Sequence, residues 1–542
     1  MRSHHFFLSA SQQPNPIRFP AKGAMQILST FLVVSLCLFF PSPATAASPH
    51  IYDVPQAGAP GSQTQTVGNG WDPNATLDIY FDSTDVGLVD TDNNGSFGMA
   101  LKAPTIRQNG LTIQIPNDAV PGQHWITAVE RITQLQAQVP FTVWTDWPQF
   151  HFDVQHTGFN PYESVLKPGT VGNLTIRWKY TMGGHVDGSP TVANGVVYAS
   201  SSNQEVNHFY ALDASTGALL WKLPISVWWR APAAVVKGVV YVGSCEDSSY
   251  LWALNAASGV VLWKRPLSCV SSSPTVVNGV VYVGSSNNLY ALNADTGATL
   301  WEYITGDTVQ SSPAVYNGVV YVGSGDGNLY ALDAGTGSLL WKHTTGAWIG
   351  SSAAVANGVV YVGSSYPDNS LYALDAGTGT LLWKYTTVGW LDSPAVANGV
   401  VYVGSSEAYF NGDLYALDAG TGVLLWEYVP EGNFDSSPAV ANGVIYVGSS
   451  KPYSDNYVYA LDAGTGVLLW KYSGGTQYID SSPAVVNGML YIGSYDGNLY
   501  AFGLPDQQMP ETFSPPERPD PARLTPNWSL QPNREVTPPL KR

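Results

Sequence analysis

Carboxylates and aromatic side chains recur at one place in a repeated pattern of this sequence, close before Ser-Ser-Pro or a variant of it. Carboxylates accept hydrogen bonds and carry charge, while the rings offer apolar contact. Together they can bind a cation, a sugar or a peptide. Four of the aspartates come from neighbouring repeats and predict an acidic arc that faces solvent. The candidate ligand-binding residues are Asp187, Trp228, Arg230, Trp348, Trp390, Asp392, Asp435, Tyr478 and Asp480.

The same aspartates have a second interpretation, which the sequence leaves open. Asp and Ser at the start of a strand can accept hydrogen bonds from exposed backbone amides and so cap the strand. A hydrolase or lyase that uses these carboxylates is a third interpretation. It has less support, because the sequence contains no nucleophile motif, phosphate-binding loop or zinc signature.

Two other groups of residues have a spacing that resembles ligand spacing. His151 and His156 stand at positions i and i+5 and could ligate a metal. We favour a structural role at the rim of the fold for both. The run from Asp90 through Asp92 and Asn94 to Gly95 has part of the spacing of a calcium loop, but no Glu lies at the expected distance. A hairpin turn is therefore the favoured interpretation.

The elements that must position these residues belong to a unit of about 40 residues that recurs from residue 175. Its clearest copy begins at Ser311. In each copy a short strand runs into Asn-Gly or Lys-Gly, a strong signal for a type I′ hairpin. A Val-rich strand, a strand like LYALDA and a strand like LLWKY follow. The last of these strands carries a tryptophan, and the eight are Trp178, Trp221, Trp263, Trp301, Trp341, Trp383, Trp426 and Trp470.

Four strands per unit of this length predict propeller blades, and the number of hairpins predicts eight blades. The copies are offset, because Trp178 precedes the first hairpin and the last unit has no tryptophan strand after it. We therefore expect residues 175–180 to supply the outer strand of the last blade, which would remove its exposed edge. The predicted fold is all-β, an eight-bladed propeller with four antiparallel strands per blade.

The segment Ala-x-Asp-x-x-Thr-Gly-x-x-x-Trp, seen at Ala331–Trp341 and in further copies, resembles the tryptophan-docking motif of the pyrroloquinoline quinone (PQQ) propeller repeat. The resemblance covers residues 175–503. It implies that each tryptophan packs against the next blade while the Asp and the Thr-Gly pair hold the turn. The eight tryptophans are then structural docking residues, because each buries a large apolar surface.

The resemblance points to two kinds of protein. Some members are quinoprotein dehydrogenases that hold PQQ and Ca²⁺, and others are scaffolds similar to the outer-membrane assembly lipoprotein, without a cofactor. The dehydrogenases carry a vicinal cysteine pair, and some carry a Cys-x-x-Cys-His haem site. Here the only cysteines outside the predicted signal are Cys245 and Cys269. The resemblance therefore favours a non-catalytic binding or scaffold protein with no cofactor, and a PQQ- and Ca²⁺-dependent dehydrogenase is the alternative.

The rest of the chain divides into four segments. Residues 1–47 predict a secretory signal peptide, since an apolar run from Met25, an alternative start, leads to small residues around Ala46. Residues 48–143 alternate apolar and polar positions and predict an immunoglobulin-like β-sandwich that resembles IPT/Ig-like modules of bacterial surface proteins. Residues 144–174 form a linker and lead-in to the propeller. Residues 504–542 are rich in proline and predict a disordered tail.

Composition and charge narrow the partners. The formal net charge of -17 repels phosphate backbones and argues against a nucleic-acid partner. The apolar run near the N-terminus is too short for a membrane span. We expect a secreted or cell-surface monomer that binds a protein, a peptide or a carbohydrate on the face with variable loops, because variable loops on a rigid ring mark a binding face. In that oxidising location Cys245 and Cys269, which emerge on the same face, are predicted to form a disulfide.

Overall fold

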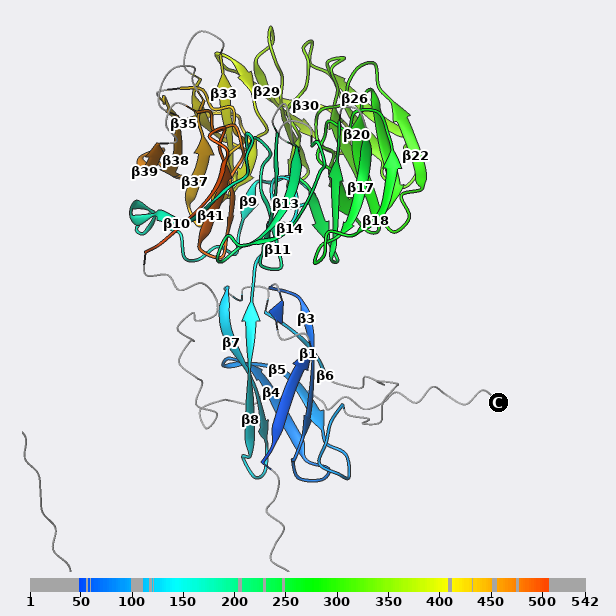
Figure 1. Cartoon of the computed structure of the whole chain (residues 1–542), viewed down its shortest axis with the longest axis vertical. Helices are drawn as coiled ribbons and strands as arrows, with labels where there is room; N and C mark the ends of the chain where they lie inside the picture. The colour runs from blue at the N-terminus through cyan, green and yellow to red at the C-terminus, as the bar shows by residue number, and fades with distance from the viewer. Residues whose placement is uncertain are drawn as a thin grey trace, which may run out of the picture. The chain divides into compact units, whose positions relative to one another are not determined.

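The structure is a computed structural model, and it describes residues 48–54, 57–58, 60–98, 111–116, 119, 121–202, 207–227, 231–245, 249–407, 412–430, 432–450, 456–473 and 477–505. The predicted signal peptide and the tail from residue 506 lie outside these ranges. Apart from the short 3-10 helix η1 (Val171–Asn173), the described elements are strands (Figure 1). No helix in the described ranges is long and apolar enough to cross a membrane.

The N-terminal part contains two sheets that share one apolar core. The first has the order β1 (His50–Val54), β3 (Gln63–Asn69), β6 (Leu111–Gln114). The second has the order β2 (Ala57–Gly58), β8 (Gln136–Val143), β7 (Gly122–Glu130), β4 (Thr76–Phe81), β5 (Thr84–Asp90). Alternate residues point inward, so Ile51 and Ile113 of the first sheet are in the same buried cluster as Ile79 and Phe141 of the second.

The segment with partial calcium-loop spacing forms a turn. The Asp92 carboxylate accepts hydrogen bonds from the backbone N–H groups of Asn94 and Ser96, at 2.8 and 2.9 Å. These contacts use the carboxylate within its own turn.

The part from Phe159 to Gly503 consists of eight sheets, each built around four antiparallel strands, which follow sequence order in every sheet but the last. Sheets 1 to 4 comprise β11 (Thr191–Ala193), β12 (Val196–Ser201), β13 (His208–Asp213) and β14 (Leu219–Leu223); β15 (Ala234–Val236), β16 (Val239–Gly243), β17 (Tyr250–Asn255) and β18 (Val261–Pro266); β19 (Thr275–Val277), β20 (Val280–Ser285), β21 (Asn288–Asn293) and β22 (Thr299–Ile304); and β23 (Ala314–Tyr316), β24 (Val319–Gly323), β25 (Asn328–Asp333) and β26 (Leu339–Thr344).

Sheets 5 to 8 follow the same plan with small additions. They comprise β27 (Ala354–Ala356), β28 (Val359–Gly363), β29 (Ser370–Asp375) and β30 (Leu381–Thr386); β31 (Trp390–Leu391), β32 (Ala395–Ala397), β33 (Val400–Ser406), β34 (Leu414–Asp418) and β35 (Leu424–Tyr428); β9 (Phe159–Asn160), β36 (Ala439–Ala441), β37 (Val444–Gly448), β38 (Tyr457–Asp462) and β39 (Leu468–Ser473); and β40 (Ala484–Val486), β41 (Met489–Gly493), β42 (Asn498–Gly503) and β10 (Thr175–Thr181). The prediction of an all-β chain with four-stranded antiparallel sheets is confirmed.

The turns within each sheet have the expected chemistry. Asn317 and Gly318, between β23 and β24, both have positive φ, at 48° and 78°, as a type I′ hairpin requires. Between β25 and β26 the Asp333 carboxylate accepts hydrogen bonds from the backbone N–H and the hydroxyl of Thr336, both at 2.8 Å. The same two turns recur from sheet to sheet and lie at the same end of the strands.

The tryptophan of each fourth strand contacts the next sheet. The Trp341 indole N–H donates to the carbonyl of Ala376 at 3.0 Å. Its ring covers Gly379, where an added Cβ would lie 2.5 Å from a ring carbon, so only glycine fits there. Equivalent indole hydrogen bonds are made by Trp178, Trp221, Trp263, Trp301, Trp383, Trp426 and Trp470.

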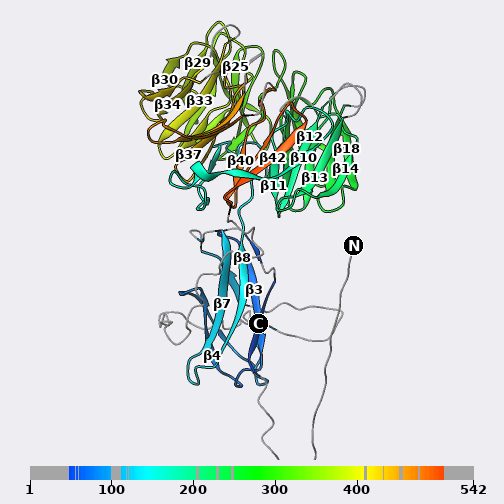
Figure 2. The same ribbon diagram turned by 60° about the vertical axis from the view of Figure 1, so that its left-hand side comes forward.

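The eight sheets follow one another in a closed cycle. Their first strands contact their neighbours in the order β11, β15, β19, β23, β27, β32, β36, β40 and then β11 again. Strand β10 precedes sheet 1 in the chain, yet it pairs with β42 of sheet 8, with Thr175 opposite Gly503 and Thr181 opposite Asn498 (Figure 2). The strand that precedes the first sheet therefore completes the last one.

Residues 147–160, here called the lead-in segment, hydrogen-bond to the first strand of every sheet. The carbonyl groups of the segment accept N–H groups from most of the strands, at 2.7 to 2.9 Å where both partners are backbone. Gln149 and Asn160 use their side chains. The partners, in chain order, are Trp147 with Val192, Pro148 with Val235, Gln149 with Val276, Val154 with Val315, Gln155 with Val355, Thr157 with Val396, Gly158 with Val440 and Asn160 with Val485.

His151 and His156 lie inside the lead-in segment and are buried. The His151 ring stacks on Phe150, with centroids 4.2 Å apart, and His156 Nε2 lies 3.0 Å from the Thr275 hydroxyl. Burial lowers the pKa of His151 to about 4 and that of His156 to about 3. The two rings are therefore neutral at pH 7 and pack as part of the core.

Cys245 and Cys269 form a disulfide in sheet 2, with Cα atoms 4.4 Å apart. We expect the intact mass of the purified protein to be lower than that of the dithiol by two hydrogens. Replacing both cysteines with serine should cost about 3 kcal/mol of unfolding free energy, because the bond closes a loop of 24 residues. Alkylation of two free thiols under native, non-reducing conditions would contradict the bond.

Candidate binding cavity

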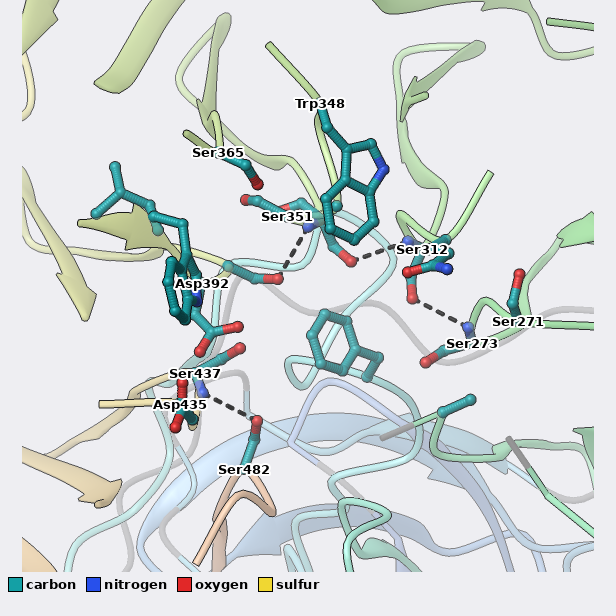
Figure 3. A pocket seen from close by; sticks show the side chains of 18 residues that line it. Ser271, Ser273, Ser312, Trp348, Ser351, Ser365, Asp392, Asp435, Ser437 and Ser482 are labelled. Atoms are coloured by element: carbon teal, nitrogen blue, oxygen red, sulfur yellow. Dashed lines mark hydrogen bonds between the residues drawn. The ribbon is translucent and has the colours of Figure 1, made fainter. Parts of the chain in front are cut away.

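A cavity of about 220 Å³ opens where the first strands begin, at the end opposite the Asn-Gly hairpins. Most of its walls come from the residues just before the first strands of sheets 2 to 8 (Figure 3). Ser365, which follows β28, and Phe150 of the lead-in segment also line it. The lining residues are Phe150, Ala231, Ser271, Ser273, Gln310, Ser312, Trp348, Gly350, Ser351, Ser352, Ser365, Trp390, Leu391, Asp392, Ser393, Asp435, Ser437 and Ser482.

A chain of serines links neighbouring sheets around this cavity. The backbone N–H of Ser273 donates to the Ser312 hydroxyl oxygen at 3.0 Å, and the N–H of Ser312 donates to that of Ser352 at 2.8 Å (Figure 3). The pattern continues from Ser352 to Ser393, from Ser437 to Ser482 and from Ser482 to Ser189. Sheet 2 has Pro232 at the equivalent place. We call these residues the serine ring.

In sheets 3, 5, 7 and 8 the serine before the ring member has a different role. The Ser272 hydroxyl oxygen accepts the backbone N–H of Gly284 at 2.7 Å, and Ser481 accepts that of Gly493 at 3.1 Å. These serines cap the second strand of their own sheet. Sequence reasoning treated Ser-Ser-Pro only as a landmark and did not single out the ring or Phe150. The recurrence of a second serine in nearly every repeat was the available signal for the ring.

Two exposed tryptophans and two carboxylates share the cavity wall. The Trp348 and Trp390 side chains are 42% and 36% exposed. Asp392 and Asp435 line the same cavity, and the Asp435 carboxylate accepts hydrogen bonds from the hydroxyls of Ser406 and Ser450. No Lys or Arg is among the described residues that line it.

The other predicted site residues are placed differently. Asp187 and Asp480 are only 3% and 7% exposed and do not line the cavity, so the expected arc of four carboxylates facing solvent is not formed. Burial raises the pKa of Asp187, and the charge of Asp480 raises it further, while a hydrogen bond from Ser202 lowers it. Tyr478 is half-buried, with its ring against Tyr495. Trp228 and Arg230 lie outside the described residues.

The described residues of the cavity offer PQQ itself no cationic partner. PQQ is a polycarboxylate, and no Lys or Arg is among the described residues that line the cavity. Asp392 and Asp435 are carboxylates of the kind that ligates Ca²⁺, so they do not argue against the ion. The two cysteines of sheet 2 are joined across 24 positions of sequence and do not form a vicinal pair. Within the described ranges, no group of three or more His, Cys, Asp or Glu side chains is arranged to hold a metal ion.

The repeats match the family described as outer membrane protein assembly factor BamB over residues 173–312, 207–344, 288–390 and 368–506, together more than half of the chain. Over 163 residues the chain is 26% identical to the dehydrogenase subunit of a quinone alcohol dehydrogenase from Gluconobacter oxydans. That match covers 30% of this chain and 17% of the relative, so the chain spans less than a fifth of the relative's length.

Two solved structures have a similar fold. A europium-containing methanol dehydrogenase superposes with a TM-score of 0.55 and 16% identity, over 66% of this chain and 98% of its own. BamB from Moraxella catarrhalis superposes with a TM-score of 0.50 and 22% identity, over 62% and 99%. The chain belongs to the PQQ-repeat propeller family described as outer membrane protein assembly factor BamB.

Proposed function

We propose that this chain is a non-catalytic binding or scaffold protein that acts outside the cell or in the envelope. The eight sheets are the blades of one closed propeller, preceded by an immunoglobulin-like domain. A protein, peptide or carbohydrate binds on the face with variable loops. The observation that carries the proposal is the cavity on that face, with two exposed tryptophans beside two carboxylates. Large exposed aromatic rings in a concave site are typical of binding surfaces.

Two further observations support a binding role over a catalytic one. The cavity has no cationic side chain among its described residues to hold an anionic quinone. The hydroxyl oxygens of the serine ring accept backbone amides, and therefore help to hold neighbouring sheets together. We include a scaffold role because the matching family is described as an outer membrane protein assembly factor.

A binding assay with matched variants tests the proposal. The full secreted chain is immobilised, and solubilised envelope from the source cells is passed over it. We expect retention of envelope material that falls at least tenfold when Trp348 and Trp390 are both replaced by Ala. Tyr52→Ala is the control, since Tyr52 on β1 is 47% exposed and does not line the cavity. Equal retention by the parent and the double variant would refute a binding role for the cavity.

A PQQ-dependent dehydrogenase is the alternative function, and the observation that supports it is the similarity to a quinone alcohol dehydrogenase. Mixing the protein with PQQ and Ca²⁺ tests it directly. We expect the absorption spectrum to equal the sum of its components, and no dye reduction when alcohols are added. A shifted quinone band with alcohol-dependent dye reduction would replace the scaffold proposal with an enzyme.

A further inference from the structure

We infer that the cavity binds the terminal sugar of a glycan, an inference that rests on the proposed binding function. A sugar presents hydroxyl groups that both donate and accept hydrogen bonds, and it also presents apolar C–H faces. The cavity offers a partner for each of these features, and these partners are set at different heights along its wall.

The serine ring supplies hydroxyl groups at the bottom of the wall. The hydroxyl oxygens of Ser312, Ser352 and Ser393 each accept one backbone N–H from the neighbouring sheet. That contact uses one lone pair and fixes the oxygen, while the O–H hydrogen and the second lone pair remain for other contacts. Because these serines line the cavity, those contacts can be made with a ligand inside it. Oxygens fixed in this way match a ligand that donates as well as accepts.

The carboxylates of Asp392 and Asp435 supply acceptors in the same wall. The hydroxyls of Ser406 and Ser450 both donate to Asp435, which orients its carboxylate. Vicinal sugar hydroxyls can donate to such an oriented carboxylate, and hydrogen bonds to charged groups are the stronger kind. The wall as a whole is therefore rich in acceptors and hydroxyls.

Trp348 and Trp390 supply the apolar surface. Trp348 lies in the segment that leads into β27, and Trp390 is the first residue of the short strand β31, which precedes β32 in the adjacent sheet. Both side chains line the cavity. Figure 3 shows the Trp348 ring among the side chains that line the cavity. An aromatic face that stays this exposed leaves apolar area that a C–H face of a sugar can cover.

The lead-in segment explains why the ligand is a chain end. Its hydrogen bonds reach the second residue of each first strand, three positions after the serine ring. Phe150 belongs to this segment and lines the cavity from that side. A polymer therefore cannot run through the ring. The volume of about 220 Å³ is below the roughly 300–1,000 Å³ of drug-sized sites and suits one ring.

Isothermal titration of the full secreted chain with methyl glycosides of glucose, galactose, mannose and N-acetylglucosamine tests the inference. We expect at least one of them to bind. Trp390→Ala and Asp435→Asn should each weaken that binding by about tenfold or more, since each removes a principal contact. Tyr52→Ala should leave the affinity within twofold. Oligosaccharides that end in the same sugar should bind within about threefold of the monosaccharide.

Other outcomes would overturn the inference. Binding of tetramethylammonium or spermidine that is lost in Asp435→Asn, with no response to the glycosides, would make the cavity a cation site. Retention of envelope material that requires Trp348 and Trp390 but is not reduced by the glycosides would leave the proposed function standing and reject the sugar. If neither glycosides nor envelope material bind, both proposals fail. Thermal melts of each variant separate lost binding from lost folding.

Discussion

A chain shortened to begin at Gly183 is expected to aggregate or to lose cooperative unfolding. The truncation removes β10 and leaves β42 as an edge whose backbone N–H and C=O groups along Asn498–Gly503 have lost their partners. An unpaired, apolar edge pairs readily with other chains. The truncation also removes Trp178, whose indole N–H donates a hydrogen bond to the carbonyl of Ala214 next to sheet 1. Size-exclusion chromatography and thermal melts measure the outcome.

A second truncation and two substitutions isolate the contribution of β10. A chain that begins at Lys167 lacks the lead-in segment but keeps β10, and should be more soluble than the shorter chain. In the full chain, Trp178→Ala should lower the unfolding free energy by about 3–5 kcal/mol, as for other buried aromatic residues. Lys179→Ala, an exposed change on the same strand, should cost less than about 0.5 kcal/mol. A stable, soluble chain that begins at Gly183 would overturn the assignment of β10 as the closing strand.

Acid is expected to destabilise the protein through His151 and His156. Both folded-state pKa values are depressed, to about 4 and about 3, so the unfolded chain binds protons that the folded chain does not. Their contribution is fully present above the unfolded pKa of about 6.5 and is lost as the pH falls toward 4. Over that range, protonation of each histidine in the unfolded chain should lower the unfolding free energy by about 3 kcal/mol.

The carboxyl of Asp153, in the same turn, has the opposite effect on the pH dependence of the unfolding free energy. Burial raises its pKa, so the folded state retains a proton that the unfolded state loses, and that favours folding at low pH. The test is therefore a difference between the parent and His156→Asn, since Asn tolerates the positive φ of 57° at this position.

Denaturant unfolding at several pH values measures that difference. At pH 7 the variant should be the less stable, because it loses the ring contacts and the bond to Thr275. The difference in unfolding free energy between the parent and His156→Asn should decrease by about 3 kcal/mol between pH 6.5 and pH 4. His343→Asn, on the fourth strand of sheet 4, is the matched control. If the unfolding free energies of the parent and His156→Asn change equally with pH, this histidine does not contribute to the acid sensitivity.

The repeat made the sheets predictable from the sequence. Each unit carries its own hairpin and its own buried apolar strand, and every unit but the last carries its own tryptophan, so local chemistry specifies local structure. Asn317-Gly318 shows this, since only a hairpin with two positive φ angles suits that pair in this setting. Pairing of β10 with β42 was also predictable, because the repeat pattern has one extra strand before the first unit and lacks one strand in the last unit.

The cavity was less predictable, because its geometry depends on contacts between repeats. Asp187 and Asp435 hold the same position in the repeat pattern, yet only Asp435 lines the cavity. The Ser202 hydroxyl donates to Asp187, whereas the Ser406 and Ser450 hydroxyls donate to Asp435. These serines lie at or just after the end of a second strand, where the repeats differ in length. The path of the lead-in segment has no period at all. Most of its bonds are made by backbone groups, which carry no residue-specific signal.

The lead-in segment also limits how this ring can change in evolution. Repeat proteins commonly gain or lose whole units, because each unit contacts only its neighbours. Here a stretch of fixed length forms hydrogen bonds with all eight first strands in order, from Val192 to Val485. A duplicated or deleted unit would leave that stretch one partner short or one partner in excess. Evolution can therefore substitute residues and insert loops on the variable face, whereas the number of sheets is constrained.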